Sequence, residues 1–148
     1  MPVNCKPRLT GDVVKFFEDI DGMGKHDGYP RNEGVPSSIK QSQSWKFCEL
    51  TEDEFMRLEI PDSTGTLIKN KDGASLGGLT KSNIKERVEM LKSGGDLAPL
   101  IVRELLPGDN KDASFYIEDG AKRAIAFKVY FESNPYRIVK SYIGKRKV

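Results

Sequence analysis

The clearest chemistry in this sequence lies at a glycine between a short β-prone run and an apolar helix. The run SFYIEDGAKRAIA places Glu118 and Asp119 before Gly120, and Lys122 and Arg123 after it. A chain that passes from a strand through a glycine into a helix presents several backbone N–H groups at one point, where an anion binds favourably. The helix dipole disfavours cations in the first turn unless an anion lies there. The pattern therefore predicts a phosphate site.

In this hypothesis the phosphate is bound mainly by the backbone. The N–H groups of Gly120, Ala121, Lys122 and Arg123 surround it, and Gly120 lets it approach because no Cβ is in the way. The Arg123 guanidinium adds a planar bidentate donor. The alternatives for Arg123 are a salt bridge with a nearby Glu and a position in water, and the alternative for Lys122 is a position in water.

The two carboxylates beside the glycine are the candidate catalytic groups. Asp119 and Glu118 could hold a magnesium ion between phosphate oxygens, or orient a water molecule as general base. We expect Asp119 to be the metal ligand. Two alternatives stay open: Asp119 caps the following helix, and Glu118 is simply exposed at the end of its strand.

A few residues elsewhere are weaker candidates. Lys81, Ser82 and Arg103 lie at the ends of predicted elements, where they could border the phosphate site. His26 is the only histidine and lies in a Gly/Pro-rich loop, so it is either a catalytic base or a solvated side chain. Trp45 could stack on a base, but its spacing to Phe47 is typical of a strand core.

The C-terminal segment is basic. YRIVKSYIGKRKV contains five cations and no carboxylate, and three of the cations are Lys145, Arg146 and Lys147. Such a cluster can contact the phosphate backbone of DNA, or it can be a solvated tail. The formal net charge of the whole chain is only +2, which gives no general indication of a nucleic-acid protein.

Composition predicts one globular, cytoplasmic domain over residues 1–148. Apolar residues make up 37% of the chain and charged residues 31%. The longest apolar run is too short for a membrane span, and no hydrophobic leader follows the N-terminus, so no membrane partner is expected. Cys5 and Cys48 are far apart and form no CxxC pair, which predicts two reduced thiols.

The first half of the chain shows scattered local signals. TGDVVKFFEDI has the apolar spacing of a helix, and a long flexible loop is expected over residues 22–44. WKFCEL reads as a strand, and TEDEFMRLEI as a short helix with Thr51 and Glu54 at capping-box spacing. Residues 66–69 are a possible edge strand. TKSNIKERVEMLKSGG then predicts a helix that ends at a glycine pair.

The second half is more regular. LAPLIVREL, SFYI and YRIVKSYIG read as strands, and residues 121–131 as a helix that is apolar enough to be buried between layers. The alternation of strands and helices predicts an α+β domain in which a small mixed β-sheet packs with helices.

The order of these last elements resembles the ParB/sulfiredoxin superfamily. The likeness runs from residue 84 to residue 144: a helix, a strand reading PLIVRE, a strand into a box with Gly120, Arg123 and Ala126, and a strand ending in YIG. The resemblance implies a nucleotide-binding core that grips phosphates at this box. Stand-alone members of the superfamily include a free-serine kinase and a fertility-inhibition protein.

Two departures from the family pattern narrow the function. Ala121 stands where sulfiredoxins have their catalytic cysteine, so sulfinic-acid reduction is not expected. Lys122 replaces the arginine of chromosome-partitioning ParB proteins, and no helix-turn-helix segment follows the box. The resemblance therefore implies a protein that hydrolyses or transfers the terminal phosphate of ATP, or of another nucleotide, with Mg²⁺.

Two other functions remain open at this point. One is a DNA-binding protein or nuclease of the ParB type, and the other is a non-catalytic inhibitor that keeps the fold and acts by contact with a partner. The identity of the nucleotide, the phosphate acceptor, the role of His26 and the oligomeric state are left undetermined by the sequence.

Overall fold

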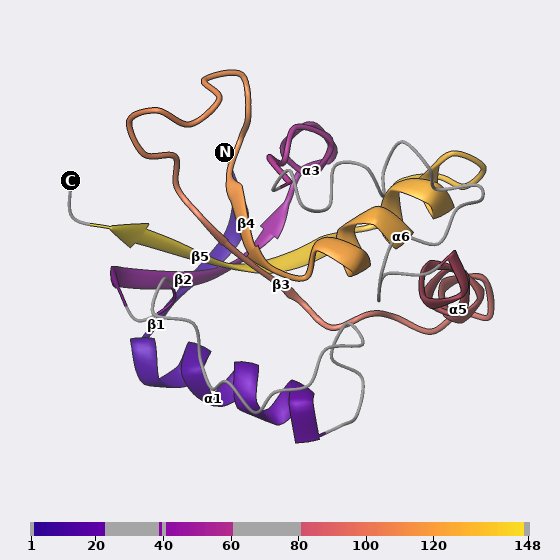
Figure 1. Ribbon diagram of the computed structural model, residues 1–148, viewed down its shortest axis with the longest axis horizontal. Helices are drawn as coiled ribbons and strands as arrows, with labels where there is room; N and C mark the ends of the chain where they lie inside the picture. Colours follow the sequence, from indigo (N-terminus) through magenta and orange to yellow (C-terminus); the bar gives the residue numbers. More distant parts are fainter. Residues whose placement is uncertain (1, 23–38, 40, 61–80, 147–148) are drawn as a thin grey trace.

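The computed structural model describes residues 2–22, 39, 41–60 and 81–146, with the side chains of 18–22 and 81–83 excepted (Figure 1). The elements of these residues run in the order β1 (Val3–Arg8), α1 (Thr10–Gly22), β2 (Ser42–Leu50), α3 (Glu52–Met56), α5 (Lys81–Lys92), β3 (Leu100–Arg103), β4 (Tyr116–Asp119), α6 (Ala121–Phe131) and β5 (Val139–Arg146).

One mixed sheet organises the described residues. Its strand order is β1-β2-β5-β3-β4, with β3 and β5 parallel and the other neighbours antiparallel. Strand β5 pairs along its length with β2 on one side and with β3 on the other, so the C-terminal strand lies at the centre of the sheet (Figure 1). The predicted arrangement, a small mixed sheet with helices, is confirmed.

Helices cover both faces of the sheet. On one face α1 contributes Val13 and Phe17 to a cluster with Trp45 and Ile101. On the other face α3 and α6 pack on a larger cluster that contains Leu100, Val102, Phe55, Phe127 and Ile143. Because successive side chains of a strand point to opposite faces, Ile101 belongs to the α1 face and its two neighbours to the α6 face.

Helix α5 lies outside α6 and packs against it through a third cluster, which consists of Ile84, Val88, Ile125 and Ala126. Helix α6 is thus buried between the sheet and α5, as its apolar composition predicts. The capping box of α3 is also confirmed. Glu54 N donates to the Thr51 hydroxyl at 3.2 Å, and Thr51 N donates to the Glu54 carboxylate at 2.9 Å.

The N-terminal region departs from the predictions. Strand β1 was not predicted, because VNCKPR combines charges with a proline and shows no apolar alternation; it forms an exposed edge strand in which those residues are tolerated. Residues 42–44 belong to β2 and not to the predicted loop. The rest of that loop, with His26, and the possible edge strand at 66–69 lie outside the described residues. Trp45 is buried in the core.

The prediction of two reduced thiols is wrong. Cys5 and Cys48 form a disulfide between β1 and β2, with their Cα atoms 4.2 Å apart. Their separation of 43 residues gave no local signal, and only the antiparallel pairing of β1 with β2 brings them together. Among the described residues, no helix has the length and apolar character needed to cross a membrane.

Candidate phosphate site at the start of helix α6

The turn between β4 and α6 depends on Gly120. Its φ of 104° and ψ of 21° lie in the left-handed region, which a residue with a Cβ enters only at a cost. A Cβ at this position would lie 2.7 Å from Arg123 Nη2 and 2.8 Å from Leu100 Cδ2. The turn therefore requires glycine for its backbone angles and also for its close packing.

Gly120 is also the N-cap residue of α6. The first intrahelical bond runs from Ala124 N to the Gly120 carbonyl at 2.9 Å. The first N–H groups of a helix have no intrahelical acceptor, and a glycine N-cap offers no side-chain oxygen to them. Asp119 lies one position before the N-cap, so the alternative in which Asp119 is the N-cap residue does not hold.

Arg123 supports the turn from inside. Its side chain is almost fully buried, and Nη2 donates to the carbonyl of Pro99 at 3.1 Å. The same nitrogen lies 3.5 Å from the Asp119 carboxylate, one helical turn earlier in the chain. Arg123 thus links the start of β3 to the end of β4. It forms a salt bridge with Asp119 and not with the Glu considered as an alternative, and its burial contradicts the alternative position in water.

Lys122 is buried as well, with 1% of its surface exposed, so its predicted alternative position in water is wrong. Two cationic side chains are therefore enclosed within the first turn of α6, and Ala121 at the helix start remains partly exposed. Burying an ammonium group is costly unless the surroundings compensate its charge. The sequence indicated the cations but not their burial, which depends on the packing of α6 between two layers.

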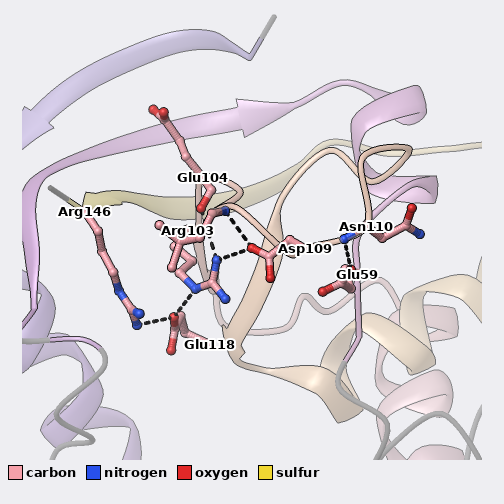
Figure 2. A network of polar contacts seen from close by, with 8 residues as sticks. Glu59, Arg103, Glu104, Asp109, Asn110, Glu118 and Arg146 are labelled. Carbon is pink, nitrogen blue, oxygen red and sulfur yellow. Dashed lines mark hydrogen bonds and ion pairs between the residues drawn. The ribbon is translucent and has the colours of Figure 1, made fainter. Parts of the chain in front are cut away.

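Glu118 takes part in a different set of ion pairs from Asp119. It follows Ile117, which packs on the α6 face, and strand alternation directs its side chain to the α1 face. There its carboxylate lies 2.9 Å from Arg103 Nε and 2.9 Å from Arg146 Nη2 (Figure 2). The Asp119 carboxylate has another arginine partner, Arg123, so the prediction that Glu118 and Asp119 act as one catalytic pair stays a prediction.

Arg103 belongs to the same network and not to the phosphate site. Its Nη1 donates to the Asp109 carboxylate at 2.6 Å (Figure 2). Its guanidinium lies over the Tyr116 ring, 4.1 Å from the ring centre. Since β3 and β4 are antiparallel, Arg103 pairs with Tyr116, at the end of β4 away from Asp119. The predicted contact of Arg103 with phosphate gains no support from this register, because its guanidinium is held by Asp109 and Glu118.

The network anchors the loop between β3 and β4. Asp109 also accepts from Leu106 N at 2.7 Å, and Glu59 accepts from Asn110 N at 2.9 Å (Figure 2). The hydrogen bond from Arg103, followed by that from Leu106 N, lowers the pKa of Asp109 below its ordinary value of 3.8. The guanidinium groups of Arg103 and Arg146 face the carboxylates of Asp109 and Glu118, so the charges of these four side chains balance, which is typical of a structural ion cluster.

The structure describes only some of the remaining candidate phosphate-binding and DNA-binding residues. Lys81 and Ser82 begin α5, which packs on α6, but their side chains lie outside the described ones. Arg146 is held by Glu118 in the network, whereas Lys145 is exposed and Lys147 is not described. The charge of Arg146 is therefore paired with Glu118, and the predicted basic cluster at 145–147 loses one cation that could contact DNA.

A magnesium ion would have few protein ligands at this site. The Glu118 carboxylate is engaged by Arg103 and Arg146, and no group of three or more His, Cys, Asp or Glu in the described part of the chain is arranged for a metal. Mg²⁺ is commonly bound through one carboxylate together with phosphate oxygens and water. Asp119 fits that limited role.

Comparisons of the chain with protein-family models, with curated proteins and with solved structures found no match. The predicted order of helix, strand, strand, helix and strand from residue 84 is present as α5, β3, β4, α6 and β5. The resemblance to ParB and sulfiredoxin domains stays a prediction that rests on the sequence. Pro99 and Leu100, which pack on the turn, were missed as site residues. The short polar stretch between PLIVRE and SFYI, which allows the two strands to pair, is the signal that could have found them.

Proposed function

We propose that this protein binds a nucleotide through its phosphates at the start of α6, and that it hydrolyses or transfers the terminal phosphate. The observation that carries the proposal is the glycine N-cap of α6, with Lys122 and Arg123 buried in the turn that follows. Backbone N–H groups and buried positive charge meet at one point, and a phosphate group complements both.

The charge distribution of the turn supports an anionic ligand in particular. A helix start is usually completed by Asp, Glu, Ser or Thr, and α6 has no acidic residue in its first turn. Arg123 acts in this proposal as a positioning residue, because it holds Pro99 and Asp119 against the turn. The backbone at Ala121, which is partly exposed, makes the direct contact.

Asp119 is the candidate for the chemical step. It is the described carboxylate next to the turn, and it can orient a water molecule or an acceptor hydroxyl toward the terminal phosphate. Bound Mg²⁺ would neutralise charge on the phosphate oxygens, with Asp119 as its protein ligand. In hydrolysis, water oxygen bonds to the terminal phosphorus as the bond to the leaving diphosphate oxygen breaks.

The test is a substitution that raises the stability of the helix while it lowers the affinity for a bound anion. A carboxylate at the first position of α6 stabilises the helix by about 0.3–1 kcal/mol, but it repels phosphate. Ala121→Asp is therefore expected to bind Mg·ATP about tenfold more weakly than Ala121→Asn, the uncharged control of the same size. Isothermal titration measures the affinities, and thermal unfolding confirms that both variants fold.

Equal affinity of the Asp and Asn variants would contradict the site, and lack of Mg·ATP binding by the native chain would contradict the function. Pyrophosphate should compete with ATP, because the phosphates supply most of the contact. DNA binding is less well supported, since Arg146 is engaged by Glu118. A gel shift at low salt that is lost in Lys145→Gln, without any nucleotide binding, would favour that alternative.

A further inference from the structure

The Cys5–Cys48 disulfide lies far along the sheet from the α6 turn and has two unlike ends. Cys5 is exposed on the edge strand β1, whereas Cys48 on β2 has only 1% of its surface exposed and packs in the core of the α6 face. An attacking group from solvent can therefore reach the sulfur of Cys5, while the sulfur of Cys48 is shielded. This asymmetry determines which sulfur is attacked and which one leaves.

A cavity of about 450 Å³ opens beside the disulfide, and its walls are positively charged. Besides the two cysteines it is lined by Asn4, Lys6, Arg8, Phe47, Glu49 and Lys140. These are three cations against one carboxylate, and that carboxylate already accepts a hydrogen bond from Asn4 Nδ2 at 2.6 Å. The cavity is large enough for a small peptide-like ligand, and its charge selects an anion.

We propose that the Cys5–Cys48 disulfide is a redox-active site that exchanges with an anionic low-molecular-weight thiol of the glutathione type. The thiolate of the small molecule bonds to the Cys5 sulfur, the Cys5–Cys48 bond breaks, and its electron pair leaves on the Cys48 sulfur, which takes a proton. A second small thiolate then attacks the mixed disulfide at the small-molecule sulfur. Cys5 leaves as a thiolate, and the small disulfide is released.

The surrounding cations have two effects on the first step. Lys6, Arg8 and Lys140 raise the local concentration of an anionic thiol, and they stabilise its thiolate form near the exposed sulfur. Phe47 provides an apolar wall over which the Arg8 guanidinium lies, 5.8 Å from the ring centre. Exposed disulfides in a thiol-containing compartment are usually transient or redox-sensing, which is consistent with this role.

The experiment compares two thiols of opposite charge on the oxidised full chain. Glutathione is anionic and cysteamine is cationic, and each rate is divided by the rate of the same thiol with 2-hydroxyethyl disulfide to remove intrinsic reactivity. We expect the normalised rate to favour glutathione by about fivefold at low salt, and to approach equality at high salt. Peptide mass spectrometry should place the mixed disulfide on Cys5.

Lys140→Gln tests the cavity wall, and Lys111→Gln is the matched control. Lys140 and Lys111 are both exposed, but Lys111 lies on the loop after β3 and does not line the cavity. Lys140→Gln should reduce the preference for glutathione about twofold, and Lys111→Gln should leave it unchanged. Three results would each overturn the proposal. They are a normalised preference of one, a mixed disulfide of glutathione on Cys48, and two titratable thiols in the oxidised chain.

Discussion

The guanidinium of Arg123 lies directly against the backbone of Gly120, with Nη2 2.7 Å from the point that a Cβ of residue 120 would occupy. The two residues therefore constrain each other: the arginine can approach Pro99 and Asp119 only because residue 120 has no side chain. The left-handed φ of Gly120 is a second and independent requirement for glycine. These two requirements can be separated by experiment.

Gly120→Ala is expected to lower the free energy of unfolding by about 2–5 kcal/mol, because strain of the backbone adds to a clash. Gly108→Ala is the matched control, since Gly108 has a φ of 95° but open space around its Cα. Gly108→Ala should lower the free energy of unfolding by only about 1–2 kcal/mol. Denaturant unfolding measures both values, and an equal loss in the two variants would show that Arg123 does not pack on the turn.

Asp119→Asn and Glu118→Gln should separate chemistry from stability. The proposed role of Asp119 predicts a fall in phosphate release by Asp119→Asn of about 10²-fold or more, with Mg·ATP still bound. Glu118→Gln should destabilise the fold by about 3 kcal/mol, because it removes the carboxylate shared by the buried Arg103 and Arg146 and leaves Arg103 with Asp109 alone, while turnover of the folded fraction is retained. Loss of turnover in Glu118→Gln, with turnover retained in Asp119→Asn, would assign the chemistry to Glu118 instead.

Asp109→Asn should change the acid stability of the fold. The pKa of Asp109 is lowered by its bond with Arg103, so the carboxylate stabilises the native state above its unfolded-state pKa of 3.8, and this contribution is lost as the pH falls through the lower folded-state pKa. At pH 7 the free energy of unfolding of the native protein should exceed that of Asp109→Asn by about 1–3 kcal/mol. This difference should shrink below about pH 4.

The control for this titration is Asp112→Asn, on the exposed part of the same loop. The free energy of unfolding of Asp112→Asn should differ little from that of the native protein at any pH. Urea unfolding between pH 7 and pH 2 gives the comparison. A stability difference for Asp109→Asn that stays constant over this range would mean that the carboxylate charge does not contribute.

Removal of the disulfide should destabilise the chain through the unfolded state. The crosslink spans 43 residues, and opening a loop of this length costs about 2–4 kcal/mol of stability. Cys5→Ser is the suitable variant, because Cys5 is exposed and the buried Cys48 thiol keeps its packing. Dithiothreitol should lower the stability of the native chain to that of Cys5→Ser and leave the variant unaffected.

Local signals were sufficient to predict most elements of this protein. The capping box of α3, the apolar stripe of α5 and the course from β3 to β5 each follow from residues within a few positions of one another, because caps and amphipathic periods are short-range properties. The glycine between β4 and α6 was predicted for the same reason. Its left-handed conformation is the local property that glycine permits.

Relationships between distant residues were decided by the tertiary structure alone. Glu118 and Asp119 are neighbours in the chain, yet their carboxylates have different partners: Arg103 of β3 and Arg146 of β5 for Glu118, and Arg123 of α6 for Asp119. Cys5 and Cys48 meet only because β1 pairs with β2. Burial of Lys122 and Arg123 depends on α6 lying between the sheet and α5, a layer order that no local pattern contains.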